Sequence, residues 1–281
     1  MTDVPRAEAE RPHVYDSALR RPRWIEEAQS LWTYRGLVHE LVVRDIKVRY
    51  KRSVLGILWT MLAPLLNMVA LTLVFSALLK TTIQNYPVYF MTGSIFWGFF
   101  AQTTTTAALQ THNSNELAKR MFVPRSVFIA SALGGGLVNL FLSLIPLILI
   151  LAATGFPLHA TWAFLPVPIL IGSLFTAGAS LVLFTAASRI ADIKEMYPVI
   201  IQTWFFLTPI VYDPSIMPGR YRFIVSLNPM YFLIRIFRDP IYDGVLPSAT
   251  LLGASFALSA AVFVTGWVFF CHRRDDMAYW S

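Results

Sequence analysis

Cysteine and charge are the two scarcest features of this sequence. A single cysteine, Cys271, excludes an internal disulfide and any cluster of thiolate metal ligands within one chain. Asp, Glu, Lys and Arg make up only 14% of the 281 residues, whereas 56% are hydrophobic. The charged share lies well below the roughly 25% usual in soluble domains. The composition therefore predicts an integral membrane protein.

The pattern of a cleavable signal peptide is also missing. The first fifty residues are polar and basic and contain no apolar h-region, so we expect the first membrane span to target the chain. Residues 1–28 are rich in Pro, Arg, Glu and Ala. We predict that they form a disordered cytoplasmic tail.

Motifs for catalysis, metal binding and nucleotide binding are missing as well. The five histidines show no paired ligand spacing. Gly134–Gly136 lacks the Lys-Ser/Thr ending of a phosphate-binding loop, and we interpret it as a close-packing or flexible point in a span. Asp239 and Asp243 could form an outward-facing acid pair; alternatively, they cap a helix and pair with Arg235 or Arg238. We therefore predict no enzyme activity and no metal or cofactor bound by this chain.

What the sequence does contain is long uncharged stretches. A helical span needs about 20 predominantly apolar residues, and the sparse charges outline six such stretches. The region from Ser126 to Ser188 carries no charged residue and is long enough for two spans with a break near Gly155. The predicted spans are residues 54–79, 86–112, 126–153, 160–188, 195–212 and 248–271, within a transmembrane domain of residues 54–272. The expected fold class is an all-α membrane protein with six transmembrane helices.

Residues 213–247, before the last span, are too long and too apolar for a simple connector. Prolines separate short apolar runs throughout this segment. Irregular backbone at membrane depth is tolerated only where it is buried in protein or lines a cavity. We therefore predict short re-entrant helices that dip into the outer leaflet and pack on the spans.

The basic residues predict the orientation of the spans, because Lys and Arg are retained on the cytoplasmic side of short loops. The predicted inner segments 113–125, 189–195 and 273–281 carry such residues, whereas the outer loops hold little besides Lys80, apart from 213–247. Both termini are therefore expected in the cytoplasm, with the chain in the inner (plasma) membrane. The net charge is +7, and the basic residues lie next to apolar runs. This position indicates that they interact with anionic lipid headgroups and not with nucleic acid.

Residues 29–53 carry the densest basic pattern and predict an amphipathic helix that lies along the membrane interface before the first span. The apolar face comprises Tyr34, Val38, Leu41, Val42 and Ile46, and the basic face comprises Arg44, Lys47 and Lys51. Asp45 and Arg49 lie on the apolar side, four residues apart. Either they pair with each other, or they contact a substrate headgroup or another subunit.

Two further patterns each allow two interpretations. Residues 113–125 begin with helix-capping residues and stop at Pro124, which predicts a short cytoplasmic helix. This helix is either a connector or a coupling helix seated in a partner's groove, and the same alternatives hold for 189–195. Aromatic residues gather in two of the predicted spans. They serve for packing and membrane belts, or they line a path on which sugar rings stack.

Together these features resemble the permease subunits of type-2 ABC exporters of the polysaccharide group, which includes O-antigen, teichoic acid, capsule and galactan exporters. The resemblance covers the chain from residue 31 to the end. Its main carrier is the stretch from Arg44 to Trp59, which runs into Pro64. The weaker carriers are Asn115–Lys119, Phe122–Arg125, Thr208–Ile210 and Leu227–Pro229.

The resemblance implies a homodimeric permease of six spans with two ATPase subunits, which bind ATP and Mg on the cytoplasmic side. It also implies a substrate in which a glycan is linked to a polyprenyl diphosphate. The implied gate and substrate-entry residues are Asp45, Arg49, Lys51, Arg52 and Trp59. The residues implied to couple to the ATPase are Asn115, Glu116, Lys119, Arg120 and Arg125. The implied sugar path comprises Phe96, Trp97, Phe100, Trp204, Phe205 and Tyr212, and the implied outer gate comprises Arg220, Arg235 and Arg238.

Two alternative functions stay open at this point. One is a type-2 ABC exporter of a drug or another small amphiphile. The other is a membrane-embedded transferase of sugars or acyl groups, which would use Asp239 and Asp243 at the outer face.

Overall fold

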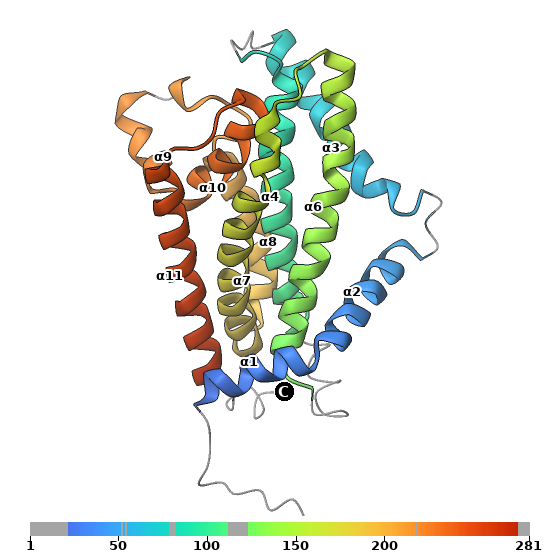
Figure 1. Ribbon diagram of the computed structural model, residues 1–281, viewed down its shortest axis with the longest axis vertical. Helices are drawn as coiled ribbons and strands as arrows, with labels where there is room; N and C mark the ends of the chain where they lie inside the picture. Colours follow the sequence, from blue (N-terminus) through green and yellow to red (C-terminus); the bar gives the residue numbers. More distant parts are fainter. Residues whose placement is uncertain are drawn as a thin grey trace, which may run out of the picture.

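A computed structural model describes residues 22–51, 53, 55–78, 83–111, 123–216 and 218–274. Within these ranges the secondary structure is helical and contains no strand (Figure 1). The predicted all-α class is therefore confirmed for the part of the chain that the structure describes.

Six of the described helices account for most of the helical bundle. They are α3 (Leu58–Thr72, continued by a π-helical segment Leu73–Leu78), α4 (Tyr86–Leu109), α6 (Ser126–Thr154), α7 (Pro166–Arg189), α8 (Asp192–Leu207) and α11 (Ala249–Arg273). Four stretches are long and apolar enough to cross a membrane: Leu58–Phe75, Ser126–Thr154, Pro166–Arg189 and Ala249–Arg273. Helices α4 and α8 occupy the other two stretches predicted to span. Length and composition thus support four of the six predicted spans among the described residues.

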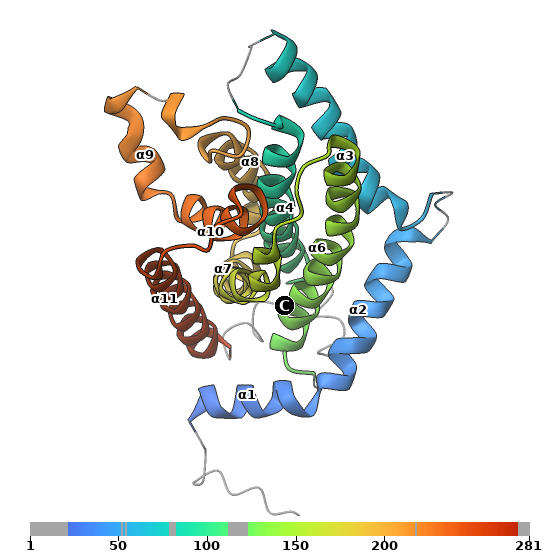
Figure 2. The same ribbon diagram turned by 45° about the horizontal axis from the view of Figure 1, so that its top comes forward.

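Helix α4 lies at the centre of the bundle, where it contacts α3, α6, α7, α8 and α10 (Figures 1 and 2). Two of its buried threonines donate a hydrogen bond within their own helix: Thr92 Oγ1 to the carbonyl of Tyr89 at 2.8 Å, and Thr104 Oγ1 to the carbonyl of Phe100 at 2.8 Å. The same hydroxyl accepts a hydrogen bond of 2.6 Å from Tyr197, which joins α8 to α4. The Thr104 and Tyr197 hydroxyls are therefore buried in this apolar bundle with hydrogen-bond partners, as buried polar groups usually are.

Helices α7 and α11 pack closely because glycines face each other across their contact. A Cβ atom on Gly178 would lie 2.6 Å from the backbone of Phe263, and one on Gly266 would collide with the carbonyl of Gly178. Small residues let two helix backbones approach in this way. Gly134 and Gly136 have a similar packing role, since a Cβ atom on Gly134 would lie 2.8 Å from the Val42 side chain of α2 and one on Gly136 would collide with the Thr103 side chain of α4.

The N-terminal region corrects two predictions. Residues 23–28 are not a disordered tail, because they begin helix α1 (Arg23–Thr33). The amphipathic helix predicted over 29–53 is interrupted at Tyr34, where α1 gives way to α2 (Arg35–Tyr50). Figure 2 shows α1 lying across one end of the bundle while α2 diverges along its side. The break lets each helix turn its apolar residues toward a different part of the bundle: α1 contacts α11 and α6, and α2 contacts α6.

The segment before the last span is built from short helices at the opposite end of the bundle (Figure 1). They are the 3-10 turns Pro214–Ile216 and Gly219–Tyr221, α9 (Arg222–Leu227), α10 (Pro229–Arg238) and the π-helical segment η6 (Asp239–Asp243). Helix α10 buries Met230, Leu233 and Phe237 completely and contacts α4, α7 and α11. The short helices are therefore attached to the bundle through α10, which α9 contacts. Their position in a membrane leaflet stays a prediction. Below, the two ends of the bundle are called the α1 end and the α10 end.

Candidate functional site

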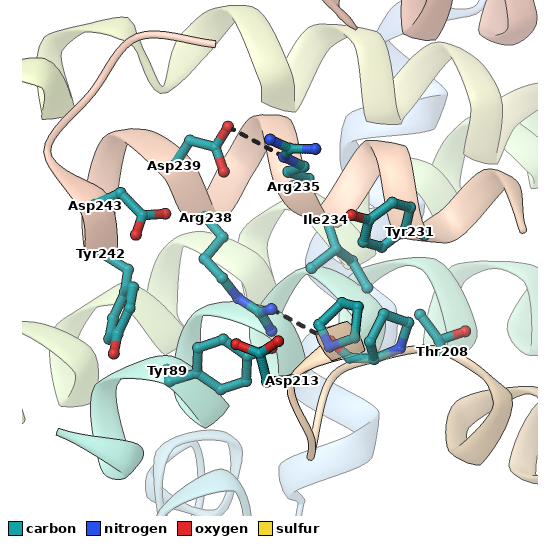
Figure 3. Close-up of a pocket in the computed structure, with 12 residues that line it drawn as sticks. Tyr89, Thr208, Asp213, Tyr231, Ile234, Arg235, Arg238, Asp239, Tyr242 and Asp243 are labelled. Carbon is teal, nitrogen blue, oxygen red and sulfur yellow. Dashed lines mark hydrogen bonds and ion pairs between the residues drawn. The ribbon is translucent and has the colours of Figure 1, made fainter. Parts of the chain in front are cut away.

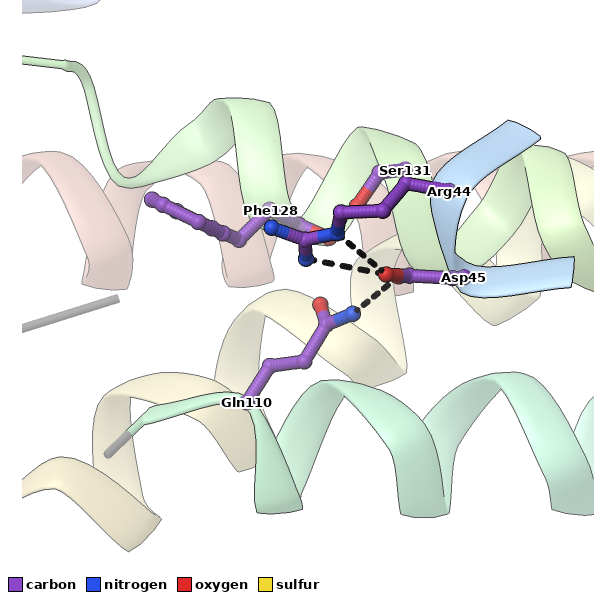
Figure 4. Close-up of polar contacts among 5 residues, drawn as sticks. All are labelled: Arg44, Asp45, Gln110, Phe128 and Ser131. Carbon is purple, nitrogen blue, oxygen red and sulfur yellow. Dashed lines mark hydrogen bonds and ion pairs between the residues drawn. The ribbon is translucent and has the colours of Figure 1, made fainter. Parts of the chain in front are cut away.

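A first group of polar residues lies where α2 meets α4 and α6. The Asp45 carboxylate accepts hydrogen bonds from Arg44 Nη2 at 2.9 Å and from Gln110 Nε2 at 3.1 Å (Figure 4). Gln110 directly follows α4, so this contact joins two distant parts of the chain. The alternative in which Asp45 pairs with Arg49 is therefore wrong, because the carboxylate turns to its sequence neighbour and to α4 instead.

Arg49 lies one turn further along α2 and faces Gln102 of α4. With the oxygen of the Gln102 amide turned toward the guanidinium, Arg49 Nη2 donates to it at 3.1 Å. A small cavity between α2, α4 and α6 is lined by Asp45, Arg49, Gln102 and Asn139. Gln110 Oε1 is buried and has no hydrogen-bond partner among the described residues. Leaving a buried polar group unpaired costs free energy. A site that served only packing would be more stable with an apolar side chain at this position.

We call Asp45, Arg49, Gln102, Gln110 and Asn139 the α2 cluster. Sequence reasoning found only its two charged members. The other three members are amide side chains inside long uncharged stretches, where polar groups usually serve packing or function. This position was the feature of the sequence that could have identified them.

The remaining residues implied for the gate are spread apart. Lys51 is exposed just after α2, and Trp59 is 47% exposed on α3. Arg52 lies outside the described residues. The structure therefore brings Asp45 and Arg49 into one site and leaves Trp59 on the outward surface of α3.

Most of the residues implied to couple to an ATPase lie outside the described part of the chain. These are Asn115, Glu116, Lys119 and Arg120. Arg125 directly precedes α6, and its Nη1 donates to the carbonyl of Arg274 at 3.4 Å. The other coupling candidate, 189–195, forms the tight link at the α1 end between α7, which ends at Arg189, and α8, which begins at Asp192.

A buried carboxylate at the α1 end joins three helices and was missed by sequence reasoning. Glu27 of α1 is 1% exposed. It accepts a hydrogen bond from Ser126 of α6 and lies 2.7 Å from Arg274 Nη1, directly after α11. Glu27 was missed because it lies in a stretch rich in Arg, Glu and Ala, which the sequence predicted to be a disordered tail.

Replacing Glu27 by alanine is expected to destabilise the α1 end, because it leaves the Ser126 hydroxyl and one guanidinium donor without their partner. We expect a cost of roughly 1–3 kcal/mol, visible as a lower melting temperature of the detergent-solubilised protein. The neighbouring Glu26, which forms no ion pair among the described residues, supplies the control E26A. Equal effects of the two substitutions would contradict a role for Glu27 as the link between the helices.

The aromatic residues implied for a sugar path divide into two groups. Phe96, Trp97 and Phe100 of α4 are buried, with exposures of 1%, 6% and 2%. Trp204 and Phe205 of α8 are partly exposed and pack edge-on against the Trp97 ring at 5.7 and 5.8 Å. The described chain therefore uses the α4 aromatics for packing, and only the α8 aromatics keep surface available.

Tyr212, implied for the same path, lies after α8 at the α10 end. It is half-buried, and its carbonyl accepts a hydrogen bond of 3.0 Å from Tyr89. Its hydroxyl group has no partner among the described residues.

A hydrogen-bond hub at the α10 end joins two short motifs that lie twenty residues apart. Asn228 caps α10 by accepting from the backbone of Met230 at 3.0 Å. Its amide nitrogen donates to Thr208 Oγ1 at 2.8 Å, and its oxygen accepts from Trp204 Nε1 at 3.0 Å. The Thr-Pro and Asn-Pro motifs of the sequence are thus held together by one side chain.

Substituting Asn228 with alanine is expected to cost roughly 2 kcal/mol, because a helix cap and a buried donor and acceptor are lost together. The melting temperature of the solubilised protein measures this effect. Thr203 offers a matched control, because its exposed hydroxyl donates only to its own helix at the carbonyl of Val199. A T203A variant that is as unstable as N228A would show that the hub contributes nothing specific.

Arg238 anchors the short helices to α4. Its side chain is buried, with 8% exposure. Nη1 donates to the carbonyl of Pro209 at 3.2 Å and Nε donates to Thr92 Oγ1 at 3.3 Å, while the guanidinium carbon lies 3.8 Å from the centre of the Tyr89 ring (Figure 3). A cation over an aromatic face is favourable, and more so away from water. This arginine, one of the three implied for an outer gate, is therefore built into the fold.

The other two arginines implied for the outer gate are exposed. Arg220 lies in a 3-10 turn, and Arg235 forms an ion pair of 3.7 Å with Asp239. Pairing with arginine, one of the two interpretations of the aspartates, is thus confirmed for Asp239. Burial raises the pKa of Asp239 to about 6, with Arg235 opposing the rise. Among the described residues, no group of three or more His, Cys, Asp and Glu side chains could hold a metal ion.

Comparison with known proteins relates the chain to membrane transporters. The family model of the ABC-2 type transporter matches residues 37–242. The O-antigen export system permease protein RfbA of Myxococcus xanthus is 30% identical over 258 residues, which cover 90% of this chain and 98% of that protein. RfbA of Klebsiella pneumoniae is 31% identical over 75% of this chain and 83% of its own length. The polysialic acid transport protein KpsM of Escherichia coli is 20% identical over 85% of this chain and 94% of its own length.

Proposed function

This chain belongs to the ABC-2 type transporter family, and we propose that it is the permease subunit of an ATP-driven exporter of a lipid-linked polysaccharide. The observation that carries the proposal is its similarity, over nearly the whole length of both proteins, to a permease named for O-antigen export. A transport protein named for polysialic acid is also similar over most of its length. The chain is thus a permease of a type-2 ABC polysaccharide exporter and a multi-pass protein of the inner membrane.

ATP and Mg are assigned to a separate ATPase, and we place it at the α1 end. The segment implied for coupling, 113–125, and the other candidate, 189–195, follow α4 and α7 in the chain, and both of these helices end here. Glu27 supports this placement, because it fixes α1, α6 and Arg274 in one arrangement beside Arg125. A force applied to the connecting segments would therefore reach several spans together. With this end in the cytoplasm, α1 and the end of α11 lie on the cytoplasmic side.

The exposed helices favour a path between two copies of the chain. Among the described residues, the core of a single copy is filled by side chains such as Phe96 and Phe100. In contrast, only Met68 is buried on α3, and only Tyr197 and Ile201 are buried on α8. Two copies that face each other through α3 and α8 would enclose a path lined by Trp204 and Phe205.

The α2 cluster is the proposed entry site for the diphosphate of the carrier lipid. Arg49 and Lys51 place positive charge where α2 ends and the first predicted span begins. The Arg49 guanidinium is held by a neutral amide and not by a carboxylate. It therefore retains its net charge for an anionic headgroup, which guanidinium groups bind through paired hydrogen bonds.

Depletion of the protein tests this function. We expect glycan linked to the carrier lipid to accumulate in the cytoplasm, and we expect an ATPase to co-purify with the chain. Stable isolation without any nucleotide-binding partner would contradict the proposal. Normal glycan export after depletion, together with loss of resistance to a small amphiphile, would favour the alternative substrate class.

A further inference from the structure

The α10 end contains a cavity of about 320 Å³ that the transport function does not by itself explain. It lies between α10, η6, the start of α4 and the chain after α8 (Figure 3). Its volume falls at the lower end of the roughly 300–1,000 Å³ typical of small-molecule sites. The residues that matter for the argument are Tyr89, Tyr231, Tyr242, Asp213, Asp243 and Arg238.

The charges in the cavity disfavour an anionic ligand. Three carboxylates, of Asp213, Asp239 and Asp243, face two guanidinium groups. Both guanidiniums are engaged, since Arg235 pairs with Asp239 and Arg238 binds Thr92, the carbonyl of Pro209 and the Tyr89 ring. The lining therefore carries one more negative than positive charge.

The carboxylates leave hydrogen-bond acceptors available. Asp243 is exposed and accepts no hydrogen bond from any residue that the structure describes. Asp213 uses one oxygen to accept from the backbone of Ser215 at 2.7 Å, which leaves its other oxygen available. An ionised carboxylate accepts hydrogen bonds but donates none. The ligand that fits must therefore supply several donors, as the hydroxyl groups of a sugar do.

Aromatic rings held in fixed positions add flat apolar faces beside these acceptors. The Tyr242 ring stacks on Phe156, with centres 5.6 Å apart, and meets the Tyr89 ring edge-on at 5.4 Å. The Tyr89 hydroxyl is fixed by its hydrogen bond to Tyr212. A hexose ring presents C–H groups on one face and hydroxyl groups around its edge, so it matches a lining of tyrosine rings and carboxylates.

We propose that this cavity binds a neutral sugar unit of the exported glycan at the α10 end. The proposal rests on the assigned transport function and names its substrate class: uncharged hexose units, and neither acidic sugars nor amines.

The test measures binding to the complete transporter, with the chain and its ATPase in lipid nanodiscs. The probes are neutral trisaccharides of glucose, mannose and galactose, the anionic trisaccharide sialyllactose, and the amine spermidine. Saturation-transfer NMR or calorimetry should detect at least one neutral trisaccharide bound more tightly than sialyllactose or spermidine. D243N should weaken this binding by about tenfold, as expected for the loss of hydrogen bonds to a charged group.

Two further variants keep the test decisive. Y231L removes a ring whose hydroxyl donates no hydrogen bond to a described residue, and it should weaken binding as D243N does. D192N changes an exposed carboxylate at the start of α8, far from the cavity, and should leave binding unchanged. The proposal is overturned if no neutral trisaccharide binds, if D243N and Y231L bind as the wild type does, or if sialyllactose or spermidine binds best. Should glycan export still depend on the chain in any of these cases, the sugar site fails while the transport function stands.

Discussion

Reversing the charge of Arg49 by substitution with glutamate is expected to reduce glycan export by roughly tenfold or more. The change removes the guanidinium that contacts Gln102. It also places a second carboxylate one turn from Asp45, where like charges repel. Helix α2 would then lose one of its two polar attachments to α4, and the proposed entry site would lose charge needed for a diphosphate. Membrane insertion should remain normal, because other basic residues flank the span.

Export is measured as surface glycan per cell at equal levels of membrane-inserted protein. E40K is the matched control, since Glu40 is a largely exposed residue on the same helix, with 76% of its side chain exposed. If the R49E variant exports glycan at the wild-type level, the basic residues near the end of α2 serve only to orient the chain in the membrane.

The second large effect is expected at Arg238, where substitution with glutamine removes two hydrogen bonds from a charged donor and should cost roughly 3 kcal/mol of stability. Glutamine cannot reproduce the stacking on Tyr89 together with both hydrogen bonds, so the Pro209 carbonyl stays buried without its donor. The short helices of the α10 end would detach from α4. We expect a large drop in melting temperature and loss of export.

R235Q serves as the comparison for stability, since Arg235 lies on the same helix with 53% of its side chain exposed. An exposed ion pair contributes about 0–1 kcal/mol, so R235Q should melt close to the wild type. If R238Q were the more stable of the two variants, the anchoring role of Arg238 would be wrong.

Sequence reasoning located the long helices because charge is costly inside a membrane. Helix α4 begins at Tyr86 and α6 at Ser126, where two of the uncharged stretches begin. The family was likewise accessible, because the stretch from Arg44 to Trp59 combines a charge pattern with a span boundary. Such features involve residues that are close in the chain, so they can be recognised from a single sequence.

Contacts between distant residues could not be obtained in this way. Asp45 had a plausible partner four residues away, yet Gln110, sixty-five residues away, holds it. The break at Tyr34 arises because α1 and α2 pack on different parts of the bundle. The sequence has no proline at this position that would predict the break. The sequence predicted that Glu27 belongs to a disordered tail, but in the fold its side chain is buried against α6 and α11. In each case tertiary packing overrides the local pattern.

The most direct test is ATP-driven transport in proteoliposomes that contain the chain, its ATPase and a glycan linked to a polyprenyl diphosphate. The measured quantity is the fraction of glycan that becomes accessible to an added glycosidase on the side opposite to ATP. We predict an ATP-dependent increase that requires this chain and is lost in R49E. ATP hydrolysis without any movement of glycan, or equal movement in vesicles that lack the chain, would contradict its assignment as the polysaccharide permease.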